Sequence, residues 1–188
     1  MLPVLKEFEI VHAYDTGYPH SRIYENILRQ LLADDVPYSV VRSGQKFAFG
    51  EAKITILHPD EGYEPHDVND SSIVFMLSYR YFRALFTGDV EKLSEARMVK
   101  KWGKQLDADI LKVGHHGSRY SSSKEFLNAV KPQYAVISLG LNNSYGYPHK
   151  QAMAVLEGSG AQIYRTDLQG DITVKTDGRN IEITPAKR

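Results

Sequence analysis

The sequence contains no cysteine among its 188 residues, and this absence removes several kinds of site at once. A disulfide framework, a thiolate zinc site and a thiol nucleophile all require cysteine side chains. Any metal ion bound by this chain must therefore be held by His, Asp, Glu or Asn.

Long apolar runs and an excess of one charge are also missing. No run approaches the ~18 apolar residues of a membrane span, and the N-terminus MLPVLKEFEI lacks a signal-peptide pattern. We therefore expect no membrane segment in this chain. Lys plus Arg and Asp plus Glu both total 23, so no global field attracts nucleic acid, although a local basic patch remains an option. The length suits one domain with a real core, which we place at 1–188.

The apolar runs that are present follow strand and helix periodicities in alternation. Ser21 is expected to cap a helix, and a second helix after Asp89 places Leu93, Ala96, Val99 and Trp102 in register. Further helices are expected over 122–131 and 150–157. The expected strands are 8–14, 38–42, 46–49, 52–59, 72–79, 81–89, 109–113, 133–139, 161–166, 170–176 and 180–184. This order predicts a mixed α/β (α+β) chain with helices covering more than one sheet.

Polar residues stand where three of the apolar strands end. Asp89 ends one strand, His115 and His116 end the next, and His149 follows the one after. In open α/β sheets, ligands bind beyond the carboxyl ends of the strands, so parallel neighbours would bring these side chains together. Carboxylate and imidazole are the ligands of Zn²⁺ or Mn²⁺ hydrolytic centres.

Each of these residues also has a purely structural interpretation. Asp89 suits a helix cap, a single histidine such as His115 is more often a structural hydrogen-bonding group, and His149 suits the start of a helix. The histidine doublet is different, because Gly114 and Gly117 flank it and permit unusual backbone angles close to a ligand.

Together the segments LFTGD, ADILKVGHHGSRYSSS, AVISLGLNNSYGYPH and YRTDLQGDITV resemble the metallo-β-lactamase-type hydrolase domain of ComEC-like competence proteins and their stand-alone relatives. The resemblance covers nearly the whole chain. It implies an αββα sandwich with one or two Zn²⁺ or Mn²⁺ ions at the edge of its sheets, activating water for attack on a phosphodiester or another ester.

The same resemblance assigns roles to individual residues. It makes Asp89 a bridging metal ligand and His115 a metal ligand, with His116 and His149 as catalytic residues beside the substrate. It implies substrate contacts at Asn69, Ser71 and Ser118.

The H-x-H-x-D-H motif that this family carries near its N-terminus does not occur in the chain. We therefore expect an N-terminally truncated domain, roughly the C-terminal two-thirds of the full fold, with weak or no metal binding and little activity by itself. An exposed sheet edge left by truncation would favour oligomerisation.

Three functions remain open at this stage. The first is a phosphodiesterase or nuclease acting on single-stranded DNA during uptake, in which Arg119 and Lys124 hold a phosphate and nearby tyrosines stack on a base. The alternative for those tyrosines is packing as loop anchors. The second is a small-molecule esterase or lactonase on the same scaffold, and the third is a degenerate, non-catalytic partner-binding domain. The resemblance alone implies an extracytoplasmic location.

Overall fold

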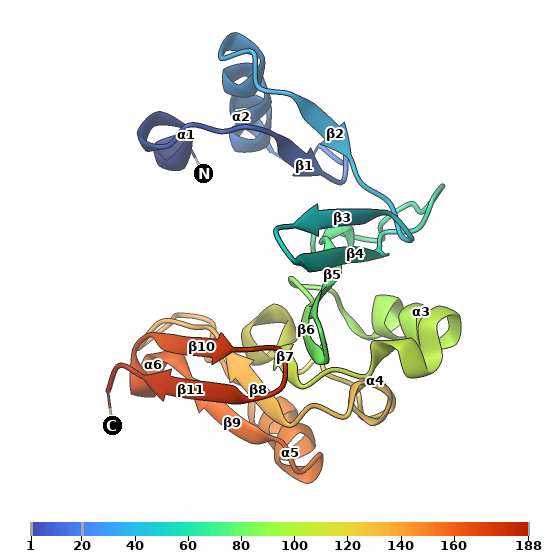
Figure 1. The fold of residues 1–188 in the computed structure, drawn as a ribbon, viewed down its shortest axis with the longest axis vertical. Coiled ribbons are helices and arrows are strands. Elements are labelled where there is room, and N and C mark those ends of the chain that lie inside the picture. Colours follow the sequence, from blue (N-terminus) through green and yellow to red (C-terminus); the bar gives the residue numbers. More distant parts are fainter. Residues whose placement is uncertain (1, 20, 188) are drawn as a thin grey trace.

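A seven-stranded sheet forms the centre of the computed structural model, which describes residues 2–19 and 21–187 (Figure 1). Its strands, in sheet order, are β3 (Lys46–Phe49), β4 (Ala52–His58), β5 (Val74–Tyr79), β6 (Phe82–Phe86), β7 (Ile110–Lys112), β8 (Tyr134–Ile137) and β9 (Gln162–Arg165). Strands β3 to β6 pair antiparallel, whereas β6 to β9 pair parallel. The carboxyl ends of β6, β7 and β8 therefore lie along one edge.

Three helices connect the parallel strands and pack on one face of the sheet. They are α3 (Lys92–Trp102), α4 (Lys124–Val130) and α5 (Lys150–Gly158). Phe126 from α4 and Leu156 from α5 are buried with Leu85 and Leu111 of the sheet in the main core. This packing fixes the strand ends from which the loops after β6, β7 and β8 emerge.

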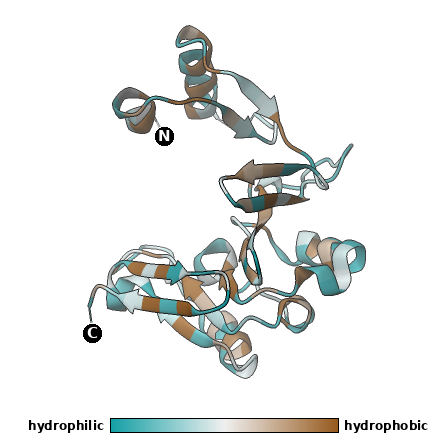
Figure 2. Cartoon of the chain, in the orientation of Figure 1, coloured by the Kyte–Doolittle hydropathy of each residue, from teal (hydrophilic) through white to brown (hydrophobic). Residues whose placement is uncertain are grey.

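The opposite face of the sheet is covered by a C-terminal hairpin, β10 (Ile172–Thr176) and β11 (Ile181–Pro185), which follows the short helix α6 (Thr166–Gln169). Apolar and polar residues alternate along both strands (Figure 2), as expected for a hairpin with one buried face. Val174 and Ile183 pack against Phe82 and Ile110.

The predicted mixed α/β class is confirmed: a helix layer, the sheet and a second β layer are stacked in that order. Among the described residues, no helix has the length and apolar character needed to cross a membrane.

Residues 2–19 and 21–40 form a smaller unit beyond β3 (Figure 1). It consists of α1 (Leu2–Glu7), β1 (Ala13–Asp15), α2 (Arg22–Ala33) and β2 (Tyr38–Val40), with β1 and β2 paired in parallel. Ser21 caps α2 as predicted, because its Oγ accepts a hydrogen bond from the Tyr24 backbone N–H at 3.2 Å. The strand predicted over 8–14 is wrong for residues 8–12, since only Ala13–Asp15 has a partner strand.

Large exposed hydrophobic side chains are concentrated in this N-terminal unit. Phe8 is 66% exposed, Val11 80%, Ile23 67% and Leu32 79%, which is far above the usual value for such residues in a packed domain. The expected oligomerisation stays a prediction, and these exposed apolar side chains would favour it.

The predicted register of α3 is only partly right. Val99 and Trp102 pack against the core, but Leu93 is 48% exposed and the helix buries Ser94, Glu95 and Met98 instead. The apolar periodicity did not predict the burial of Glu95, because that burial depends on backbone N–H donors from the loop after β7.

His58 is a buried structural residue whose Nε2–H donates to the Asp70 carbonyl at 2.7 Å. Burial lowers the pKa of His58 below its ordinary 6.5; the Asp70 hydrogen bond and the charges of Asp60 and Asp70 oppose this, while Arg97 lowers it further. The unfolded chain therefore takes up a proton before the folded chain does as pH falls through 6.5.

We expect the free energy of unfolding to decrease as pH drops below about 6.5, by at most about 1.4 kcal/mol per pH unit for this one group. Urea unfolding at several pH values would measure the slope. His58→Gln retains an N–H donor for the Asp70 carbonyl without a titrating ring, so its slope should be smaller. Equal slopes for the two proteins would contradict the assignment.

Candidate functional site

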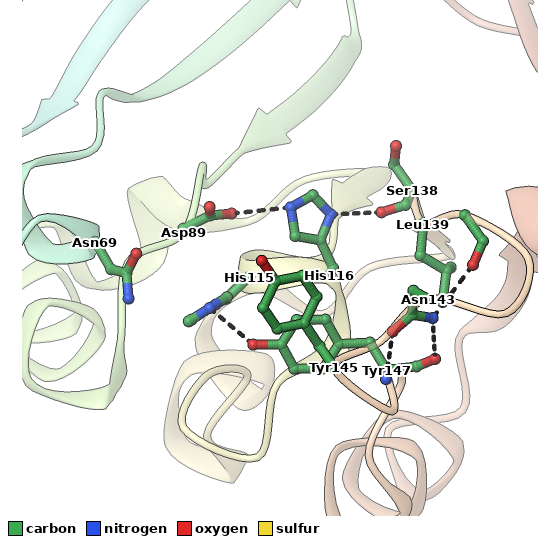
Figure 3. A pocket seen from close by; sticks show the side chains of 10 residues that line it. Asn69, Asp89, His115, His116, Ser138, Leu139, Asn143, Tyr145 and Tyr147 are labelled. Atoms are coloured by element: carbon green, nitrogen blue, oxygen red, sulfur yellow. Dashed lines mark hydrogen bonds and ion pairs between the residues drawn. The ribbon is translucent and has the colours of Figure 1, made fainter. Parts of the chain in front are cut away.

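The loops after β6, β7 and β8 surround one cavity of about 610 Å³ at the sheet edge (Figure 3). The sequence predicted that polar residues after these strands would meet at one edge if the strands were parallel neighbours. Strands β6, β7 and β8 are parallel neighbours. Four predicted site residues line the cavity: Asn69, Asp89, His115 and His116. The remaining wall comes from the loop after β8 and consists of Ser138, Leu139, Gly140, Asn143, Tyr145 and Tyr147.

His116 is the histidine that faces Asp89. Its Nδ1 lies 2.5 Å from the Ser138 carbonyl oxygen, and its Nε2 lies 3.6 Å from Asp89 Oδ1. A carbonyl can only accept, so Nδ1 carries a proton, and in the neutral ring Nε2 then presents a lone pair to the carboxylate. His116 Nε2 and Asp89 Oδ1 are then two acceptors that face each other, an arrangement that a proton or another cation between them stabilises.

His115 turns to different neighbours. Its Nε2 is 3.0 Å from the Tyr147 hydroxyl, and its Nδ1 is 3.4 Å from Glu91 Oε1. Both histidines have left-handed backbone angles, with φ of 47° for His115 and 53° for His116, which is an uncommon and strained conformation for two consecutive residues. The two rings therefore have different polar partners, although both line the same cavity.

Two glycines allow the loops to approach closely enough to form the cavity. A Cβ added at Gly88, whose φ is +54°, would lie 2.7 Å from Ser72 Cβ, and one at Gly117, whose φ is +81°, would lie 2.7 Å from Pro148 Cβ. The Gly88 and Gly117 carbonyls accept hydrogen bonds from the backbone N–H groups of His115 and His149 respectively. These two hydrogen bonds therefore join the loop after β6 to the loop after β7, and the loop after β7 to the loop after β8.

Three predicted site residues lie outside the cavity lining. His149 precedes α5, and its Nδ1 accepts from the Arg119 backbone N–H at 3.1 Å. Ser118 is buried and accepts from the Tyr120 backbone N–H, while the Ser71 hydroxyl donates to the Val68 carbonyl at 2.6 Å. All three support the loops on which the cavity is built.

The sequence did not indicate the residues that hold these loops in place. Asn143 accepts from the Tyr147 backbone N–H and donates to the Tyr147 and Gly140 carbonyls, closing the loop after β8. The Asn-Asn-Ser-Tyr-Gly sequence was a usable signal for this, since asparagine commonly closes turns by bonding to its own backbone neighbourhood.

Glu95 is the second such residue, and it is 1% exposed. Its two carboxylate oxygens accept from the backbone N–H groups of Ser122 and Ser123 at 2.5 and 2.8 Å. Burial raises the pKa of the Glu95 carboxyl above its ordinary value, and these hydrogen bonds oppose the rise. Glu95 thus joins α3 to the segment that follows the histidine doublet.

Lys112 provides a positive charge close to the carboxylate of Asp89. Its Nζ donates to the Val113 carbonyl at 2.9 Å. Burial lowers the pKa of Lys112 below its ordinary value, and the charge of Asp89 partly restores it. The Asp89 carboxylate thus interacts electrostatically with a lysine and faces the His116 imidazole.

The donor chemistry of Asp89 and His116 fits a divalent cation such as Zn²⁺ or Mn²⁺. The Ser138 carbonyl holds the second nitrogen of His116 in the way that outer partners orient metal-ligating histidines. The pair supplies two ligands, whereas structural zinc sites use four. Within residues 2–19 and 21–187, no group of three or more His, Asp or Glu side chains is placed to hold one ion.

Comparison with known families agrees with this geometry. The Metallo-beta-lactamase superfamily matches residues 6–140, which is more than half of the chain, and the chain therefore belongs to that superfamily. Among solved structures, a candidate metal-dependent hydrolase from Parabacteroides distasonis has a TM-score of 0.51 at 14% identity, with 88% of this chain and 80% of that one covered. At that identity the match supports the fold alone.

Curated relatives are similar over most of this chain. ComE operon protein 3 of Bacillus subtilis is 32% identical over 155 residues, which cover 82% of this chain and 20% of that protein. Competence protein ComA of Neisseria gonorrhoeae is 36% identical over 126 residues, which cover 67% of this chain and 18% of that protein. The chain thus spans about a fifth of the length of these relatives.

Proposed function

We propose that this chain contributes Asp89 and His116 as the protein ligands on one side of a metal-dependent phosphodiesterase site that acts on DNA during uptake. The observation that carries the proposal is the 3.6 Å approach of His116 Nε2 to Asp89 Oδ1 inside the cavity. Membership of the superfamily supports a hydrolytic site, and the similarity to proteins named for competence supports DNA as the substrate.

A divalent cation held by Asp89 and His116 would act as a Lewis acid on the phosphoryl group and would lower the pKa of water to roughly 7. The chain's own residues bind and orient the substrate. Asn69 presents a carboxamide to the cavity, and the charge of Lys112 partly offsets the negative charge of Asp89. In this arrangement, His115 takes a positioning role through Tyr147 rather than the metal-ligand role expected from the sequence.

Two protein ligands leave the cation weakly held. We therefore propose that the 188-residue chain by itself binds Zn²⁺ or Mn²⁺ with modest affinity and turns over phosphodiesters little, if at all. The absence of a third ligand among the described residues supports this half of the proposal.

Removing either ligand is expected to weaken metal binding at least about 10-fold, because a single remaining donor cannot compete with water for the ion. Isothermal titration of Zn²⁺ and Mn²⁺ into the unchanged chain, Asp89→Asn and His116→Gln would measure this effect. His66→Gln is the matched control, since His66 is exposed and lies outside the cavity lining, so this variant should bind metal as the unchanged chain does.

Two outcomes would contradict the proposal. Equal affinity in all four proteins would remove Asp89 and His116 from the metal site and favour a non-catalytic, partner-binding domain. Chelator-sensitive hydrolysis of bis(p-nitrophenyl) phosphate by the unchanged chain would overturn the expected lack of activity.

A further inference from the structure

We propose that the ring of Tyr145 is a stacking platform for one base of a single-stranded nucleic acid whose backbone enters the cavity. This inference rests on the proposed function and names the form of its substrate. Tyr145 lines the same cavity as Asp89 and His116, yet its side chain is 73% exposed. An exposed aromatic ring at the mouth of a cavity is a feature that needs an explanation.

The Tyr145 ring is supported on one side and open on the other. It stacks on Tyr147, with ring centroids 5.5 Å apart and planes 15° apart, and Figure 3 shows the two rings lying one over the other. Within the described residues its side chain has no hydrogen bond or ion pair, so its role as a loop anchor is limited to this one contact. The open face remains free for a flat partner.

Tyr147 provides a rigid base for the platform. Asn143 accepts from its backbone N–H and donates to its carbonyl, each at 2.9 Å, and the Tyr147 hydroxyl is 3.0 Å from His115 Nε2. Its ring also makes an edge contact with His149, at 5.0 Å between centroids. These contacts hold the Tyr147 ring in place beneath Tyr145, so the stacked pair rests on an ordered base.

The row of rings leads to the candidate metal pair. The Tyr147 and His116 rings are 6.3 Å apart and within 25° of parallel, and His116 in turn faces Asp89. A base on Tyr145 therefore places its own phosphate group at the entrance of the cavity that holds Asp89 and His116.

Within the described residues, the cavity lining carries no positively charged lysine or arginine side chain that would attract a nucleic acid. It contains the carboxylate of Asp89 and two histidines. Stacking on an aromatic ring adds a contact that needs no positive charge, and it tolerates any base because every base has a π-face. A duplex keeps both faces of its bases covered by neighbours, so the platform selects unpaired strands.

The test compares two fluorescent oligonucleotides of equal charge by anisotropy, with chelator present so that no metal contributes. One is an oligothymidylate of about 12 nucleotides, and the other is an abasic strand of the same length. Tyr145→Ala should bind the oligothymidylate about 5- to 150-fold more weakly than the unchanged chain. It should bind the abasic strand equally, and Tyr145→Phe should restore binding.

Tyr81→Ala is the matched control, because Tyr81 is 71% exposed and lies away from the cavity lining. It should bind both strands as the unchanged chain does. The platform is refuted if the unchanged chain shows no preference for thymidylate over the abasic strand, or if Tyr145→Ala retains that preference. Because chelator is present, either result is independent of the metal titration and the hydrolysis assay, which test the proposed function.

Discussion

Replacing Gly117 by alanine is expected to destabilise the fold by about 2–5 kcal/mol and to distort the cavity. Gly117 has φ of +81°, a region that costs an L-residue about 1–2 kcal/mol. The new Cβ would also lie 2.7 Å from Pro148 Cβ and 3.3 Å from Pro148 Cα. The second contact is with backbone, so relief requires movement of the loop that holds Tyr147 and His149.

The urea unfolding midpoint would measure this effect, and Gly140→Ala is its control. Gly140 lines the same cavity, but a Cβ there meets nothing within 4 Å, so its replacement should change stability by less than about 0.5 kcal/mol. A Gly117→Ala protein as stable as the Gly140→Ala protein would show that the close approach of the two loops does not constrain the fold.

Glu95→Ala is expected to lower stability by about 3–5 kcal/mol, through a cavity in the core and two abandoned backbone donors. The buried Ser122 N–H group would lose its acceptor at a cost of about 1–3 kcal/mol, and the half-buried Ser123 N–H group would lose its acceptor at a smaller cost. Glu95→Gln should fall between the two proteins, because its amide oxygen still accepts from one N–H group while its NH₂ group meets the other N–H donor to donor.

Urea unfolding would again provide the measurement, with Glu157→Ala as the control. Glu157 lies in α5 and is exposed, so its removal should leave the midpoint nearly unchanged. A Glu95→Ala protein that unfolds at the midpoint of the control would mean that the hydrogen bonds from Ser122 and Ser123 are not needed for the fold.

The sequence predicted the parts of the site that depend on strand order. Each of β6, β7 and β8 is an apolar run followed at once by Asp89, the histidine doublet or the loop to His149, and parallel pairing then brings the ends together. Such patterns are readable because burial of a strand on both faces leaves a continuous apolar run.

The orientation of the two histidines could not be predicted in the same way. His116 faces Asp89 because His115 and His116 both adopt left-handed angles, and these depend on the contacts of Gly88 and Gly117 with distant residues. Glu95 was missed for a related reason: its acidic side chain suggests an exposed position, and only the backbone of Ser122 and Ser123 makes its burial favourable.

Stability is not shared evenly along this chain. Within the described part of residues 2–40, only Thr16 and Leu31 are buried, whereas the segment from Val74 to Leu156 supplies most of the main core. We therefore expect amide groups in β1, α1 and α2 to exchange with solvent through local opening at energies far below that of β6, β7 and β8. The N-terminal unit would then open while the sheet around the candidate site stays folded.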